Sequence, residues 1–117
     1  MDMMKLYGLK NCDSCRKAMK ALDGAHVRYA FHDIREEAPT KMQVGRWAKA
    51  VGTDALLNTR STTWRNLPAK DKQDLDEKKA VALMAANPTL IKRPLIENGA
   101  TQVFAGWTKD VEGKLLK

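Results

Sequence analysis

The two cysteines of this 117-residue chain are the residues best suited to chemistry. Cys12 and Cys15 lie three positions apart, after a short strand-like segment and at the start of a helical pattern. Unpaired N–H groups at a helix start favour negative charge, so a thiol placed there ionises more readily than a free one. Lys10, Arg16 and Lys17 add positive charge nearby. The pattern predicts a reactive thiolate at Cys12, with Cys15 close enough to resolve a mixed disulfide internally.

The cysteine pair has two other interpretations. Free cysteines are often small buried apolar residues with no chemical role. A zinc site would need two further ligands, and the only histidines are His26 and His32, on or beside a predicted strand. Neither has an acidic partner that the sequence identifies. We therefore expect no metal site.

Two further segments carry arginines that could bind an anion. Arg93 stands in Lys92-Arg93-Pro94, just before a predicted strand, where proline is tolerated because no ladder hydrogen bond is needed. It would offer a planar, permanently charged contact, or it would be an ordinary exposed loop residue. Residues 58–65 (NTRSTTWR) contain Arg60 and several hydroxyls. These could hold an anionic substrate, or the hydroxyls could cap a short helix.

Composition excludes some classes of function. The chain is 44% hydrophobic and 30% charged, as in ordinary globular proteins, and its longest apolar runs are far below the ~20 residues of a membrane span. The formal charge of +7 is spread along the chain without a basic block, so we expect an anionic substrate or acidic partner rather than nucleic acid. The first residues show no secretory pattern, which predicts a cytoplasmic protein.

The first third of the chain predicts a β-α-β unit. Residues 4–8 read as a strand, and from Cys12 the apolar residues recur at helical spacing until Gly24, which we expect to end the helix in a left-handed conformation. Val27, Tyr29 and Phe31 then alternate with other residues as a second strand. Two strands joined through a helix are expected to be parallel.

The middle of the chain, residues 39–88, is helical in character. Thr40 is a plausible N-cap for a helix that carries Trp47 on its apolar face and stops at Gly52. Short segments with turns follow at residues 56–60 and 62–65. Residues 71–87 contain a longer amphipathic helix, closed by Asn-Pro.

The last part predicts a β-hairpin and a terminal helix. Residues 94–97 and 101–104 read as strands joined through a turn at Asn98 and Gly99, and residues 109–117 as a short helix. This order indicates an α/β, thioredoxin-like fold with a mixed four-stranded sheet, in a single domain of residues 1–117 with a helical insertion at about 39–88. In such a fold, Pro94 is expected to be a cis-proline that presses its loop against the reactive cysteine.

Taken together, these segments resemble the arsenate reductase family of glutathione- and glutaredoxin-linked type, and more closely its Spx-like branch. The resemblance runs over nearly the whole chain. It is carried by residues 11–18 (NCDSCRKA), 56–60 (LLNTR), 87–88 (NP) and 90–96 (LIKRPLI). The cysteine segment and the Lys-Arg-Pro segment, in this order and spacing, are its most specific parts.

The resemblance implies roles for particular residues. Cys12 matches the family's nucleophile, and Arg93 matches an oxyanion-binding arginine before the cis-proline. Arg60 lies about two positions from a second family arginine, and Asn11 and Arg16 are assigned to the same anion-binding site. The third arginine of true arsenate reductases would fall near residues 104–106, where this sequence has none. Arsenate is therefore not the expected natural substrate.

Two hypotheses of function follow. The first is a reductase in which the Cys12 thiolate attacks an oxidised or oxyanion substrate, with glutathione or a glutaredoxin-like protein as electron donor and no bound cofactor. The retained pair Arg60 and Arg93 favours it. The second is a Spx-like regulator that binds RNA polymerase through a Cys12–Cys15 redox switch. The complete Cys-x-x-Cys without the third arginine favours that one. Either is expected to act as a monomer.

Overall fold

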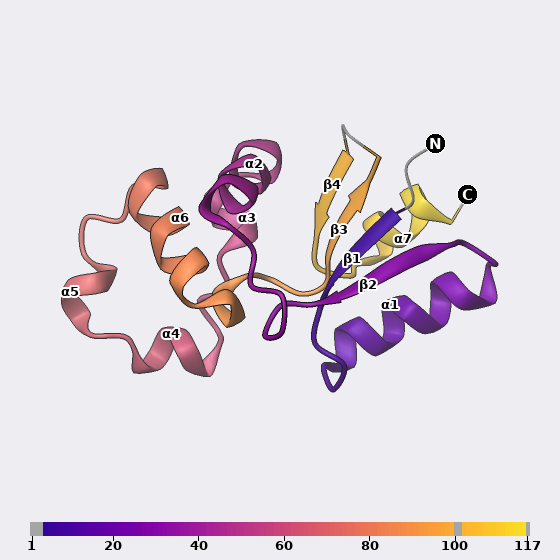
Figure 1. Cartoon of the computed structure of the whole chain (residues 1–117), viewed down its shortest axis with the longest axis horizontal. Coiled ribbons are helices and arrows are strands. Elements are labelled where there is room, and N and C mark those ends of the chain that lie inside the picture. The colour runs from indigo at the N-terminus through magenta and orange to yellow at the C-terminus, as the bar shows by residue number, and fades with distance from the viewer. Residues whose placement is uncertain (1–3, 100–101, 117) are drawn as a thin grey trace. The chain divides into compact units, whose positions relative to one another are not determined.

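The structure is a computed structural model that describes residues 4–99 and 102–116 (Figure 1). The chain divides into two compact units. The first combines the N-terminal residues up to Glu37 with the C-terminal residues from Arg93 onward. The second is continuous, from Ala38 to Lys92, and contains the helical block expected from the sequence.

The first unit is built on a four-stranded sheet. Its strands are β1 (Met4–Gly8), β2 (Tyr29–Asp33), β3 (Leu95–Asn98) and β4 (Gln102–Ala105), in the spatial order β2-β1-β3-β4. β1 and β2 are parallel, whereas β3 is antiparallel to both β1 and β4. The predicted mixed sheet and its β-α-β opening are confirmed. β1 is central, so the chain that leaves its end at Gly8 enters the middle of the unit.

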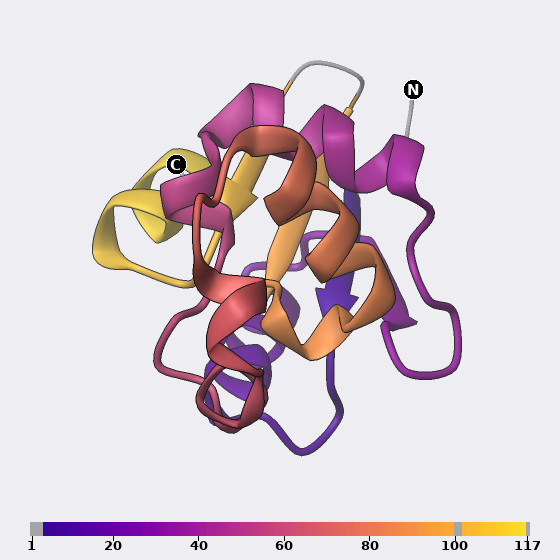
Figure 2. The same ribbon diagram turned by 90° about the vertical axis from the view of Figure 1, so that its left-hand side faces the viewer.

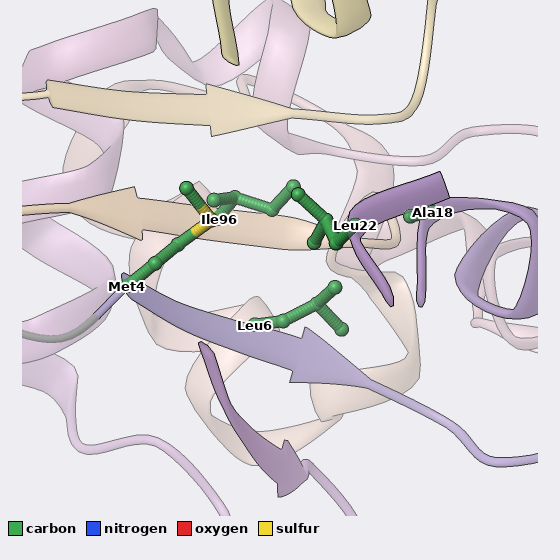
Figure 3. Close-up of a cluster of buried hydrophobic side chains, with 5 residues drawn as sticks. All are labelled: Met4, Leu6, Ala18, Leu22 and Ile96. Atoms are coloured by element: carbon green, nitrogen blue, oxygen red, sulfur yellow. The ribbon is translucent and has the colours of Figure 1, made fainter. Parts of the chain in front are cut away.

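Two helices, α1 (Asp13–Gly24) and α7 (Lys109–Leu115), cover one face of this sheet. α1 buries the residues spaced three and four apart, as its sequence period predicts. Ala18 and Leu22 of α1 lie against side chains of β1 and β3 (Figure 3). Leu115 of α7 packs against the same cluster. The cluster consists of Met4, Leu6, Ala18, Leu22 and Ile96. This packing fixes the start of α1 beside the end of β1.

The end of α1 differs from the sequence prediction. Gly24 is still helical, and the residue in the left-handed region is His26, with φ of 59°. The His26 N–H bonds the Asp23 carbonyl at 3.1 Å and the Val27 N–H bonds the Leu22 carbonyl at 2.9 Å. These two bonds form a Schellman motif, in which the left-handed position falls two residues after the helix rather than on its last glycine.

The second unit is helical. Its helices are α2 (Lys41–Val51), α3 (Thr53–Leu56), α4 (Thr62–Asn66), α5 (Ala69–Lys72) and α6 (Glu77–Ala86), followed by the 3-10 helix η1 (Pro88–Leu90). α2 and α6 pack on each other and can be followed by colour in Figure 2. Thr40 caps α2 through a full capping box with Gln43, and Trp47 is fully buried, both as the sequence predicts.

Two further details correct the sequence prediction. The segment at 71–87 contains the predicted helix, α6, closed by Asn87, but this helix begins only after its N-cap Asp76, and Asp74 before it has φ of 51°. In the hairpin, Asn98 pairs with Gln102 and so belongs to β3 instead of the turn, while Gly99 takes φ of 72°. The predicted strand start at Thr101 and the last residue of the terminal helix lie outside the described residues.

Candidate functional site

Cys12 occupies the N-cap position of α1. Its backbone is extended, and its carbonyl accepts the first helical bond, from the Arg16 N–H at 2.9 Å. Its own N–H bonds the Leu9 carbonyl at 3.2 Å, which closes the turn after β1. At this position a Ser or Thr oxygen would accept the N–H of the third helical residue, and here a half-buried sulfur stands in its place.

The surroundings of Cys12 favour its thiolate. Partial burial, the largest single influence, opposes ionisation of the thiol. It is outweighed by hydrogen bonds from the Cys15 N–H, the Cys15 side chain and Arg93, together with the charge of Arg93. The net effect holds the pKa of Cys12 below its ordinary value. No side-chain hydrogen bond of regular cap geometry is formed, so the Cys15 N–H acts here as a nearby dipole more than as a full cap.

Cys15 is the opposite of Cys12. Its side chain is 0% exposed, on the buried face of α1. Burial raises the pKa of the Cys15 thiol to about 12, and the Cys12 sulfur adds to this, although a hydrogen bond from the Leu9 backbone works against it. Both cysteines are free thiols. The pair therefore consists of an accessible thiol that ionises readily and a shielded thiol that keeps its proton.

Arg93 is brought to Cys12 by the loop before β3. The Arg93–Pro94 peptide bond is cis, and Pro94 is buried. The Gly106 N–H, after β4, bonds the Pro94 carbonyl at 2.8 Å and ties this loop to the hairpin. Gly106 has φ of 84°, a conformation that a residue with a side chain rarely adopts. The hairpin thus holds the cation that faces the Cys12 sulfur.

The other predicted residues of the first unit lie differently. Arg16 directs its Nε to the Lys10 carbonyl, at 3.2 Å, and its Nη1 lies 3.9 Å from an oxygen of Asp13. Asn11 is exposed in the turn before α1. The charge that lowers the pKa of Cys12 comes from Arg93, distant in sequence, and not from these neighbours. The anion-binding roles of Asn11 and Arg16 stay predictions.

Arg60 belongs to the second unit. It is exposed, and its N–H bonds the Asn58 side-chain oxygen at 3.1 Å. Ser61 accepts the Trp64 N–H at 3.1 Å and caps α4, so that hydroxyl has the structural role that the sequence left open. The predicted contact of Arg60 with a substrate anion stays a prediction.

His32 has partners that the sequence did not identify. Its Nδ1 lies 3.1 Å from Oε2 of Glu37, and its ring stacks on Tyr7 with centroids 4.9 Å apart. The Tyr7 hydroxyl in turn donates to Glu97 at 3.2 Å. The parallel register, which pairs Tyr7 with His32, is the signal that could have indicated the stacking. Glu37 follows a turn beyond β2, so no strand or helix periodicity in the sequence predicts its contact with His32.

The described residues offer neither a metal site nor a membrane-spanning helix. Within residues 4–99 and 102–116, no group of three or more His, Cys, Asp or Glu side chains is placed to hold a metal ion. In the same part of the chain, no helix is long and apolar enough to cross a membrane.

Comparisons with known proteins place this site in a family. The ArsC family model matches residues 7–111. The global transcriptional regulator Spx of Staphylococcus aureus is 32% identical over 111 residues, which cover 92% of this chain and 82% of that protein.

Solved structures agree with this assignment. That of a YffB protein has a TM-score of 0.92 at 38% identity and covers 98% of this chain and 100% of that one. An arsenate reductase (ArsC) related protein from Brucella melitensis has a TM-score of 0.75 at 32% identity, covering 99% of this chain and 96% of that one. The fold is therefore thioredoxin-like, and the chain belongs to the ArsC family.

Proposed function

We propose that this chain is a thiol reductase in which Cys12 is the nucleophile and glutathione, or a glutaredoxin-like protein, is the electron donor. One observation carries the proposal: the Cys12 sulfur sits at the start of α1, where Cys15 and Arg93 lower its pKa. Thiol–disulfide exchange requires an accessible thiol that ionises readily, and a lowered pKa provides this. The proposal takes the chain to act in the cytoplasm as a monomer, without a bound cofactor.

With a disulfide as the oxidised substrate, the reaction proceeds by successive thiol–disulfide exchanges. The Cys12 thiolate attacks one sulfur of the substrate, forms a mixed disulfide and releases the other sulfur as a thiolate, which takes a proton from water. Either glutathione or Cys15 then attacks the Cys12 sulfur of the mixed disulfide and releases the second substrate thiol. If glutathione attacks, Cys12 is left bonded to glutathione, and a second glutathione frees the Cys12 thiolate and forms oxidised glutathione. If Cys15 attacks, the product is a Cys12–Cys15 disulfide, which two glutathiones reduce to the two free thiols while they become oxidised glutathione.

Arg93 would bind a negatively charged group of the substrate. Its guanidinium lies beside the Cys12 sulfur, so an anionic group of the substrate or of glutathione would meet it as the thiolate attacks. Arg60, Asn11 and Arg16 are proposed as further contacts to that anion. Because residues 104–106 hold no arginine, arsenate remains outside the proposal as the natural substrate.

The test is a turnover assay with glutathione and bis(2-hydroxyethyl) disulfide, followed by the oxidised glutathione produced. Cys12→Ser is expected to reduce the rate to the uncatalysed background, because a neutral hydroxyl is a far weaker nucleophile than a thiolate. Arg93→Ala is expected to lower kcat/KM by about tenfold or more, since hydrogen bonds to charged groups contribute ~1.5–3 kcal/mol.

The matched control for the arginine is Arg28→Ala, an exposed arginine of the same unit, which should retain the wild-type rate. Full activity in Cys12→Ser would contradict the reductase proposal.

A second candidate is a redox-sensing regulator, favoured by the 32% identity with Spx and by the two cysteines three positions apart. Here an oxidant would take two electrons and two protons from the pair to form the Cys12–Cys15 disulfide, and the affinity for RNA polymerase would change. Capture of purified RNA polymerase on the immobilised chain distinguishes the candidates. The regulator requires binding that differs between reduced and oxidised chain, and the reductase requires turnover that Cys12→Ser removes.

A further inference from the structure

The end of β1 is a glycine for reasons of space. Gly8 is a strand residue paired with Asp33 and buried in the unit, and its backbone is extended, so any residue could adopt its conformation. Glycine weakens a strand interior, and its presence there often marks the close approach of another group. At Gly8 that group is a thiol: a Cβ at this position would overlap the Sγ of Cys15.

The overlap concerns that one atom only. The same Cβ would lie 3.5 Å from the Cβ of Cys15 and 3.7 Å from Cδ2 of Leu6, which are ordinary contact distances. An alanine at position 8 would therefore fit the backbone of α1 and the core beside it. It would not fit the Cys15 sulfur in its present place, and few other χ1 rotamers are open to a helical side chain.

The space beside Gly8 holds the Cys15 sulfur in the position from which it interacts with Cys12. From there its side chain makes the hydrogen bond to the Cys12 sulfur, and it stays 0% exposed. A sulfur displaced by a side chain at position 8 would lose that geometry, so the hydrogen bond and the shielding would be lost together.

We propose that Gly8 is a positioning residue: its missing side chain lets the Cys15 thiol lie against the end of β1, where it stabilises the Cys12 thiolate and stays out of reach of external reagents. The inference rests on the proposed function only for the importance of Cys12 in turnover. The experiments that test it measure the ionisation of the Cys12 thiol and the stability of the fold. Their outcome therefore does not depend on any substrate.

The first measurement is the pH dependence of Cys12 alkylation by iodoacetamide in wild type and Gly8→Ala. The midpoint is expected to rise by about one pH unit in the variant, which corresponds to the loss of one hydrogen bond to a charged sulfur. The matched control is Gly24→Ala in α1, because a Cβ at Gly24 meets nothing within 4 Å. That variant should keep the wild-type midpoint. A midpoint in Gly8→Ala that is unchanged or lower would overturn the proposal.

The second measurement is a double-mutant cycle with Cys15→Ala, which removes the sulfur that position 8 would meet. In this background Gly8→Ala should leave the Cys12 midpoint unchanged, and it should reduce the urea midpoint of unfolding far less than it does in wild type. If Gly8→Ala alone fails to fold, the double variant is expected to fold. An equal loss in both backgrounds, or failure of the double variant to fold, would show that the Cys15 sulfur is not the reason for the glycine and would overturn the proposal.

Discussion

Two cysteines three positions apart have opposite acid–base character because each meets a different part of the helix. Cys12 precedes the first turn, where N–H groups and Arg93 face its sulfur. Cys15 is one turn further in and points into the apolar interior. Burial disfavours the charged form of a thiol, whereas donors and a cation favour it. The residue that can attack is therefore set by position along α1.

The buried thiol should make stability depend on pH. Burial raises the pKa of Cys15 to about 12 in the folded chain, against ~8.5 for a free thiol. Between these values the unfolded chain releases a proton that the folded chain keeps, so the free energy of unfolding falls as pH rises, by about 1.4 kcal/mol per pH unit. Cys12, with its lowered pKa, acts oppositely: its stabilisation is complete above the unfolded pKa and is lost as pH falls through the folded one.

Urea unfolding between about pH 9 and 10.5 tests this difference. Wild type should lose stability more steeply than Cys15→Ala, because the variant lacks the buried thiol and the groups other than the two cysteines titrate alike in both proteins. Parallel losses would mean that the Cys15 thiol ionises as an exposed one does.

At the residue scale, the local part of the site could be predicted and the distant part could not. The thiolate at Cys12 follows from its spacing and its place before a helix. The approach of the Arg93–Pro94 loop to Cys12 was expected only from the fold and the family resemblance, since no sequence period by itself brings the loop before β3 to the start of α1. From the sequence, Gly8 could be recognised only as the end of a strand. The requirement for glycine there comes from the nearby Cys15 sulfur, which the sequence does not place.

At the element scale, hydrophobic period and capping chemistry predicted β1, α1 and α2 closely. The predictions failed where backbone hydrogen bonds decide the outcome, as at the end of α1. There the pattern pointed to Gly24, but the Schellman bonds put the left-handed conformation on His26. The same reason explains the hairpin, where the register of β3 and β4 takes in Asn98.

The left-handed position after α1 yields a further prediction. His26→Gly should raise the free energy of unfolding by about 0.5–1 kcal/mol, because glycine is the residue that best tolerates φ of 59° at this point of a Schellman motif. Ala25→Gly is the matched control: with φ of −92° it gains nothing from glycine and should lose stability. Urea denaturation measures both. A loss of stability in His26→Gly would contradict the role given to this residue.

At the scale of the whole molecule, the sequence predicts the fold more completely than the function. The order of strands and helices could be predicted along nearly the entire chain, and the family match extends over residues 7–111. Similar proteins are described as a transcriptional regulator and as related to arsenate reductase, so one scaffold carries different functions. What the sequence could not settle is the chemistry of the partner, because a net charge of +7 suits any anion.

The central claim is that Cys12 attacks and Cys15 only resolves, and the mass of the intact protein after treatment with oxidised glutathione tests it most directly. Cys15→Ser should accumulate an adduct one glutathione heavier, since the first exchange proceeds and no second thiol displaces the glutathione. Wild type should end two hydrogens lighter and unmodified, as the internal disulfide.

In the same experiment Cys12→Ser should remain unmodified, because its only thiol is buried and holds its proton. An adduct on Cys12→Ser together with none on Cys15→Ser would reverse the two roles. No adduct on either variant would contradict the redox account of the pair.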